Sequence, residues 1–232
     1  AEFVRSKGVS IRTNWHVEEI RRSSGGRYVV TGNHGELAAD AVVVASPARH
    51  SASMIETLSS DSASMLARRE HASIVMVTLA VSRSQWPEWL SGSGYLVTKP
   101  KQTAITAASF ASNKWAHLQS ANDAMILRVS LGRDGMPMHH HDETLVRLAL
   151  ADLNWHLDLD LQPHAQRVTR WVESFPQYRP GHESDVARLD QLLYRDAPGV
   201  VLAGASYRGI GIPACVADGR RAGRIAAQGV SV

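Results

Sequence analysis

The chain has 232 residues, of which 44% are hydrophobic and 20% charged, and its formal net charge at pH 7 is +3. These values are ordinary for a globular protein of one or two domains that can bury a sizeable core, and they argue against a disordered chain. Its scattered arginines lack the interleaved aromatic residues of a nucleic-acid-binding surface, and the single Cys215 excludes an internal disulfide or a cysteine-rich metal site.

The amino-terminal part of the chain is predicted to form strands. Alternating apolar residues and turn-forming glycines predict strands at 9–13, 17–21, 27–31 and 38–45. The β-branched run Val42–Val44 favours a central buried strand. No apolar run approaches the roughly 20 residues that span a bilayer, and the first residues lack a signal-peptide core.

The residue pattern in the middle of the chain changes twice. Residues 51–69 are rich in alanine and serine and predict one or two short helices, where we expect the chain to cross into a second domain. Strand-like segments without helices between them follow and indicate a mostly antiparallel sheet, at residues 74–81, 93–97, 105–111 and 125–131.

Two helices and a strand come next. Residues 142–156 place Val146, Ala149, Leu150 and Leu153 on one helical face, and acidic residues begin the segment, where they complement the helix dipole. A strand is expected at 167–172, and a second helix is expected over 182–194.

The chain closes on a strand, a glycine-spaced loop and a helix. The apolar run Val200–Ala203 between Gly199 and Gly204 predicts a buried parallel strand. The helix start that follows directs backbone N–H groups and a positive dipole end at whatever covers the loop, which suits an electron-rich or anionic ligand. Gly209 and Gly211 lack a Cβ, so a flat ring could approach the main chain. An ordinary strand-to-helix connection remains the alternative.

Residues 202–219, Leu-Ala-Gly-Ala-Ser-Tyr-Arg-Gly-Ile-Gly-Ile-Pro-Ala-Cys-Val-Ala-Asp-Gly, resemble the carboxy-terminal half of a protoporphyrinogen oxidase, as do Trp171–Tyr178 and Gly181-His182. The family comprises FAD-dependent porphyrinogen oxidases with the amine-oxidase fold, and its Gram-positive members act on coproporphyrinogen III. A Rossmann G-x-G-x-x-G unit is missing, because Arg208-Gly-Ile-Gly-Ile-Pro lacks the third glycine. We therefore expect a fragment that begins within a longer protein.

The resemblance implies an α/β (α+β) fold in two parts. Residues 1–48 and 191–232 would belong to the FAD domain, and residues 49–190 would form a substrate domain built on a mostly antiparallel sheet with flanking helices. The resemblance also implies oxidation of coproporphyrinogen III or protoporphyrinogen IX in heme biosynthesis, with FAD as cofactor and O2 as acceptor. The isolated fragment would be inactive without the missing amino-terminal half. A cytoplasmic location follows, with peripheral membrane contact left open.

Site residues are carried over by position. Val17 matches the valine whose backbone lies against the adenine of FAD, and Trp171 matches the tryptophan beside the flavin. Ile210, Gly211 and Ile212 match the run that touches the flavin ring through its backbone. For the substrate, Trp115 matches the aromatic residue that stacks on the tetrapyrrole, and Tyr95 with Leu96 match part of an apolar wall. Lys114 is a candidate anchor for a propionate.

Other chemistries remain weaker hypotheses. His139–His141 invites a metal site, but consecutive residues in an extended segment point to alternate sides, so no metal is expected. No G-x-S-x-G elbow supports a hydrolase, and Cys215 has no designated base. An amine oxidase or carotenoid desaturase of the same fold, or a non-catalytic truncated module, remains the alternative.

Overall fold

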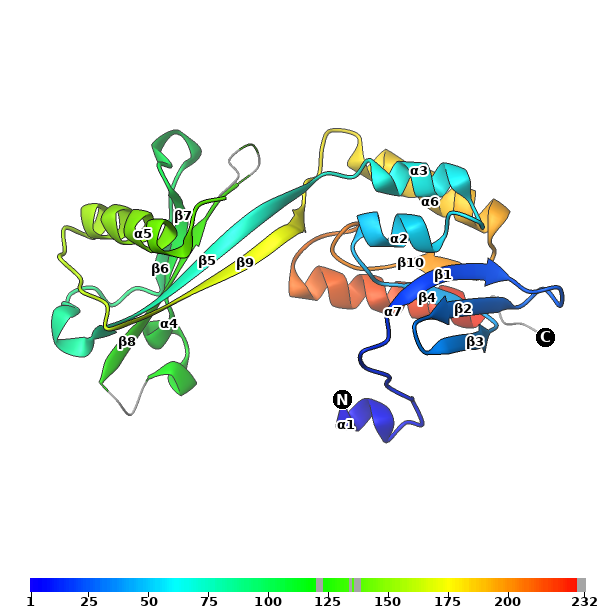
Figure 1. Cartoon of the computed structure of the whole chain (residues 1–232), viewed down its shortest axis with the longest axis horizontal. Coiled ribbons are helices and arrows are strands. Elements are labelled where there is room, and N and C mark those ends of the chain that lie inside the picture. Colours follow the sequence, from blue (N-terminus) through cyan, green and yellow to red (C-terminus); the bar gives the residue numbers. More distant parts are fainter. Residues whose placement is uncertain (120–122, 134, 136–138, 229–232) are drawn as a thin grey trace. The chain divides into compact units, whose positions relative to one another are not determined.

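A computed structural model of the chain describes residues 1–119, 123–133, 135 and 139–228 (Figure 1). The chain divides into two compact units, Ala1–Arg69 with Tyr178–Val232, and Glu70–Gln177. We expected the divisions at residues 48 and 191, whereas the units divide after Arg69 and after Gln177. The assignment of one unit to FAD and the other to substrate stays a prediction.

The first unit begins with short α1 (Glu2–Arg5) and a three-stranded antiparallel sheet, β1 (Val17–Arg22), β2 (Tyr28–Gly32) and β3 (Gly35–Ala39). The predicted strand at 9–13 is wrong: these residues are exposed and, within the described chain, pair with no strand. Alternation alone cannot make a strand without a neighbour to bond.

A two-stranded parallel sheet lies at the centre of this unit. β4 (Val42–Val44) pairs in register with β10 (Val200–Leu202), which confirms the parallel strand expected near the end of the chain. The single strand predicted at 38–45 is wrong because the chain bends at Asp40–Ala41, where it leaves one sheet for the other. Within the described residues β4 has β10 as its neighbour, and Val43 is 39% exposed.

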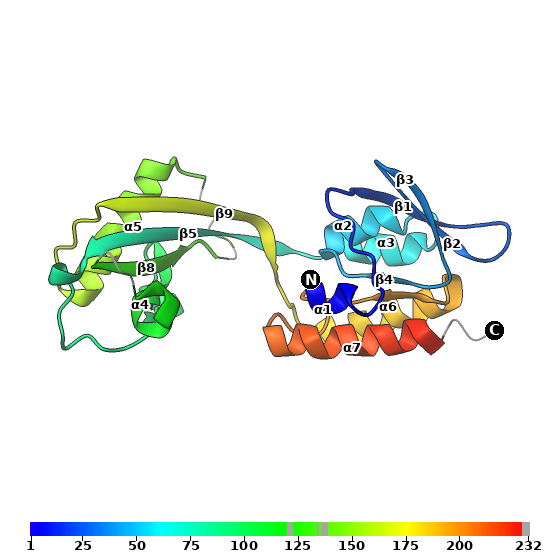
Figure 2. The same ribbon diagram turned by 90° about the horizontal axis from the view of Figure 1, so that it is seen from below.

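Helices cover both faces of the parallel pair (Figure 2). Val44, Val200 and Leu202 face a core shared with helices α2 (Ala48–Met54), α3 (Ser60–Ala67) and α6 (His182–Asp196). Val201 and Ala203 face Ala222 of α7 (Ile212–Gln228). The predicted apolar face of α6 is confirmed, since Val186, Leu189 and Leu193 are buried. β10 is buried at all three of its residues, which explains why this strand is apolar throughout.

The second unit is one five-stranded antiparallel sheet in the order β6-β7-β8-β5-β9. Its strands are β5 (His71–Ser82), β6 (Gly94–Leu96), β7 (Ile105–Phe110), β8 (Ala124–Leu131) and β9 (Ala165–Pro176). Short turns of helix connect them, at η1 (Arg83–Gln85), η2 (Lys99–Lys101), α4 (Ala111–Lys114) and η3 (Ala116–Leu118). The predicted α/β (α+β) fold with a mostly antiparallel sheet is confirmed.

One long helix, α5 (Asp142–Leu157), packs against one face of this sheet (Figure 1). Val146, Ala149 and Leu153 are buried as predicted, together with Leu145. They meet alternate residues of the central strands, such as Val77 and Leu79 of β5. The other alternate positions lie on the opposite face, which matters below.

Candidate functional site

The loop between β10 and α7 lies where two parallel strands end together. β4 and β10 run in the same direction, so their carboxyl ends share one edge of the sheet. In open α/β sheets this edge is where ligands bind, because loops and helix starts gather there. The loop runs from Gly204 to Gly211 and enters α7 at Ile212.

Asp218 of α7 anchors the beginning of the loop. The residue is 4% exposed, and its Oδ2 accepts the N–H of Gly204 at 2.9 Å. Its Oδ1 accepts from Arg221 at 2.8 Å and from Arg208 at 3.3 Å, and Arg208 also pairs with Asp190 of α6. A buried carboxylate with charged partners and a backbone donor is well compensated, so it holds the loop to the helix.

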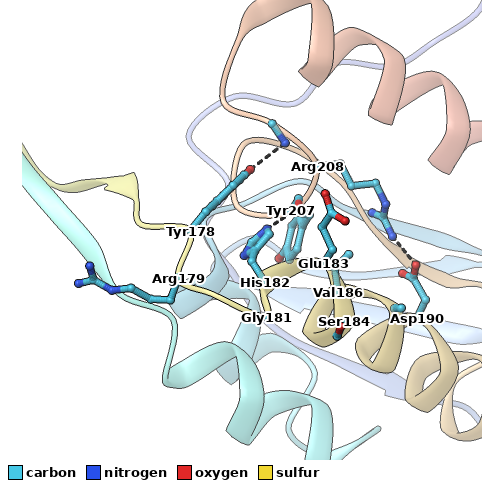
Figure 3. Close-up of a pocket in the computed structure, with 12 residues that line it drawn as sticks. Tyr178, Arg179, Gly181, His182, Glu183, Ser184, Val186, Asp190, Tyr207 and Arg208 are labelled. Carbon is cyan, nitrogen blue, oxygen red and sulfur yellow. Dashed lines mark hydrogen bonds and ion pairs between the residues drawn. The ribbon is translucent and has the colours of Figure 1, made fainter.

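Tyr178 fixes the middle of the loop from the side (Figure 3). Its hydroxyl donates to the carbonyl of Ala205 at 2.6 Å and accepts the N–H of Gly209 at 2.8 Å. Its ring stacks on His182, with ring centroids 3.7 Å apart. Burial raises the pKa of Tyr178, so the hydroxyl stays protonated and keeps its donor role at neutral pH.

His182 completes this support. Its Nε2 lies 2.7 Å from the carbonyl of Tyr207, so that nitrogen carries the proton, and its Nδ1 accepts from Arg69 at 2.8 Å. Burial lowers the pKa of the Arg69 guanidinium, which nonetheless remains charged at neutral pH. We call Tyr178, His182 and Asp218 the loop clamp.

The part of the loop beyond the clamp is open. Ile210 is 45% exposed, Ile212 is 82% exposed, and Gly211 is exposed. Among the described residues, no hydrogen-bond partner is found for the N–H groups of Ile210 and Gly211. A Cβ on Gly211 would meet nothing closer than Pro213 Cδ at 3.9 Å, so the space above this residue is free. Gly209 differs, because it has φ +121° and its Cβ would lie 2.6 Å from Ala214.

A pocket of about 810 Å³ lies beside the clamp, between α6 and the loop (Figure 3). His182, Asp190, Tyr207 and Arg208 line it. Arg208 pairs with Asp190, His182 bonds the carbonyl of Tyr207, and the hydroxyl of Tyr207 donates to Ser51 at 3.4 Å. The amide donors of Ile210 and Gly211 lie on the loop itself.

The other predicted cofactor residues lie in separate elements. Val17 is half-buried at the start of β1, where it pairs with Gly32 of β2. Trp171 lies on β9 of the second unit, opposite Ile74 of β5, and is 54% exposed. Cys215 is half-buried and its thiol lies 3.5 Å from the carbonyl of Gly209.

The predicted substrate residues lie in the second unit. Tyr95 turns toward α5, where its hydroxyl bonds His156 at 3.0 Å, and burial raises its pKa. Leu96, the next residue, lies on the opposite face and is 84% exposed. Both border a pocket of about 600 Å³. Trp115 lies outside the lining of that pocket, half-buried with Lys114 Nζ 4.8 Å from its ring.

His139–His141 form an exposed approach to α5. Among the residues that the structure describes, no group of three or more metal-ligating side chains is placed to hold an ion. Across residues 1–119, 123–133, 135 and 139–228, no helix combines the length and apolar character needed to cross a membrane.

The open end of the loop fits a flat, electron-accepting ring. Two free N–H groups and the start of a 17-residue helix provide positive potential, and two exposed isoleucines provide apolar contact. The sequence pattern found the loop but missed the clamp. Tyr178 and Gly209 are 31 residues apart, and no spacing rule connects them.

Comparisons with known proteins identify the family of the chain. A family model described as flavin containing amine oxidoreductase matches residues 1–227. A coproporphyrinogen III oxidase of Bacillus subtilis is 31% identical over 202 residues, covering 86% of this chain and 42% of that protein. One of Mycobacterium bovis is 32% identical over 223 residues, covering 95% and 45%. The chain thus spans less than half the length of these relatives.

Solved structures agree. A protein of Exiguobacterium sp. 255-15, named provisionally as a protoporphyrinogen oxidase, matches with a TM-score of 0.77 and 29% identity, covering 95% of this chain and 48% of that one. A UDP-galactopyranose mutase matches with a TM-score of 0.68 at 12% identity, covering 86% of this chain and 42% of that one, which shows a shared fold. The family resemblance inferred from residues 202–219 is confirmed, and the chain belongs to the flavin containing amine oxidoreductase family.

Proposed function

We propose that the protein carrying this chain oxidises a porphyrinogen to the porphyrin, with coproporphyrinogen III ahead of protoporphyrinogen IX, bound FAD as the cofactor and O2 as the final acceptor. The observation that carries the proposal is the clamped loop, whose open end offers two free N–H groups at a helix start. The names of the relatives support the substrate class.

The roles of the chain's residues follow from their chemistry. Bound FAD would supply an acceptor for hydride equivalents, six hydrogens in all over three two-electron steps, with O2 as the final oxidant and hydrogen peroxide as its product. The N–H groups of Ile210 and Gly211 stabilise the negative charge that the ring gains. Ile210 and Ile212 exclude water from the contact. Val17 would hold the adenine of FAD through its backbone, and Trp171 would lie beside the flavin.

No side-chain base is assigned to the reaction. Aromatic stabilisation of the product favours hydrogen removal, and the exposed loop end of the described chain offers amides and isoleucines as its contacts. The chain's contribution is therefore binding, orientation and electrostatics. Trp115 and Leu96 are proposed to contact the tetrapyrrole, with Lys114 near a propionate. The expected contact from Tyr95 is not proposed, because its side chain turns toward α5, on the face opposite Leu96. A cytoplasmic location is part of this proposal, with peripheral membrane contact left open.

The test is direct reduction of the bound cofactor. Full-length protein loaded with FAD is mixed anaerobically with coproporphyrinogen III, and bleaching of the flavin absorbance is followed together with the rise of porphyrin fluorescence. Admission of O2 is expected to restore the flavin and release hydrogen peroxide. Protoporphyrinogen IX is expected to react more slowly. Bleaching by an amine or a carotene, with none by either porphyrinogen, contradicts the proposal in favour of the other members of the fold.

A further inference from the structure

We propose that Arg128 and Arg167 bind carboxylate groups of the substrate on the face of the five-stranded sheet opposite α5. The inference rests on the proposed function, because it takes the occupant of that face to be a porphyrinogen, a broad apolar ring with carboxylates at its rim. It adds two binding residues that no family motif in the sequence pointed to.

The two arginines are held at the same level of the sheet. Thr78 of β5 pairs with Arg128 of β8 on one side and with Arg167 of β9 on the other. Directly opposed residues of antiparallel strands point to the same face, and neighbouring strands lie about 4.8 Å apart. The two Cα atoms are therefore about 10 Å apart, and both side chains are exposed.

The register identifies the face. Val77 and Leu79 of β5 are fully buried in the core beneath α5. Thr78 lies between them in sequence and so points the other way, as do the arginines paired with it. The face turned away from α5 is thus the one on which both guanidinium groups lie.

Neither arginine is neutralised by a described residue of the chain. In the part of the chain that the structure describes, no ion pair involves Arg128 or Arg167, and none of the paired positions on this face carries a carboxylate. Arg170, three residues along β9 on the other face, is satisfied: it pairs with Asp142 and donates to the carbonyl of His140 at 2.8 Å. Two unpaired cations on one face are complementary to an anionic ligand with separated charges.

The rest of the face suits the ring. Trp171 and Ile74 are paired on it four residues along β5 from Thr78, a distance of about 13 Å. Leu96 lies on the same face, and both it and Trp171 are strongly exposed for apolar side chains. A tetrapyrrole that contacts Trp171 spans enough of the sheet for its rim carboxylates to reach the two guanidinium groups, whose side chains are long.

The experiment measures binding of coproporphyrin III, the stable product, to the FAD-loaded full-length protein by quenching of tryptophan fluorescence. Arg128→Gln and Arg167→Gln are each expected to raise Kd about tenfold, and the double variant on the order of a hundredfold. Coproporphyrin III tetramethyl ester, which has the same ring without charge, is expected to bind the parent and the double variant within twofold. Arg170→Gln is the matched control, and it keeps Kd for coproporphyrin III within twofold.

Lysine variants separate lost charge from lost folding. Arg128→Lys and Arg167→Lys keep the cation and are expected to recover most of the binding lost with glutamine. Unchanged binding of coproporphyrin III by the double glutamine variant overturns the arginine assignment, as does an equal loss of ester binding. If the parent oxidises porphyrinogen while the double variant binds normally, this inference alone fails. A parent that binds no porphyrin at all overturns both proposals.

Discussion

A single hydroxyl connects the two sides of the glycine loop. Tyr178 bonds Ala205 through its proton and Gly209 through its lone pair, so one side chain sets the path of the main chain on both sides of Tyr207. The loop end that is proposed to meet the flavin begins directly after Gly209. Preorganised donors are effective because they need no rearrangement when charge develops. The position of this hydroxyl is therefore expected to affect cofactor binding through the loop, without a contact between Tyr178 and the cofactor.

Tyr178→Phe tests this role. The variant keeps the ring stacked on His182 but removes both hydrogen bonds, which is expected to cost about 1 to 2 kcal/mol of stability and to lower FAD affinity several-fold. Chemical denaturation and a flavin titration measure the two effects. Tyr194→Phe is the control, because Tyr194 is 82% exposed and the change should alter neither quantity. Wild-type FAD affinity in Tyr178→Phe would argue against the clamp.

The two glycines of the loop are expected to respond differently to alanine. Gly209→Ala places a Cβ 2.6 Å from Ala214 at a positive φ, so it should destabilise the fold by about 1 to 3 kcal/mol. Gly211→Ala meets only free space, so its melting temperature should equal that of the parent. The added methyl occupies the place proposed for the ring and should weaken FAD binding about tenfold or more. Thermal melts and flavin titrations of both variants decide, and tight FAD binding by Gly211→Ala would exclude ring contact at this residue.

At the scale of elements, one carboxylate fastens α5 to the strand beneath it. Asp152 accepts from the hydroxyl of Thr103 at 2.6 Å and from the N–H groups of Ala104 and Ile105 at 2.8 and 3.0 Å. Partial burial opposes ionisation, but the hydrogen bonds outweigh it and lower the pKa of Asp152. The carboxylate thus ties the start of β7 to the helix that carries the core residues Ala149 and Leu153.

This link predicts a pH dependence. Because the folded pKa of Asp152 is depressed, its stabilisation is complete above the unfolded pKa of about 4 and is lost as the pH falls through that value and below. Asp152→Asn should cost roughly 1 kcal/mol at pH 7, and the difference from the parent should shrink below pH about 4. Urea unfolding at several pH values measures it. A difference that grows on acidification would show that the carboxylate is not the stabilising form.

Local pattern predicted most elements because their causes are local. The apolar period of α5 and α6 and the apolar runs of β4 and β10 reflect the burial of particular faces. The strand at 9–13 failed because pairing depends on a neighbour that the pattern does not name. The loop clamp could not be predicted, since it joins Tyr178 and Asp218 to a loop through contacts that fold topology alone creates. Likewise, Arg128 and Arg167 become neighbours only through the sheet register.

At the scale of the whole molecule, each unit has its own core. The buried cluster of the second unit draws on residues between Val75 and Leu161, and the larger cluster of the first unit draws on residues before Arg69 and after Tyr178. Among the residues that the structure describes, none belongs to both clusters. The second unit is moreover one continuous segment, 70–177, so its chain can be cut out without breaking any strand of its sheet.

Residues 70–177 expressed alone are therefore expected to fold cooperatively, since one core and a complete five-stranded sheet lie within the segment. Near-ultraviolet circular dichroism and thermal melting measure this. Leu153→Ala, which removes a fully buried side chain, should lower the melting temperature of the segment by an amount equivalent to about 2 to 5 kcal/mol. In the whole chain that change should shift one unfolding transition, and Leu189→Ala in the first unit should shift the other. A single transition that moves with both substitutions would mean that the two cores unfold as one, and a segment without a cooperative melt would mean that the sheet depends on the rest of the protein.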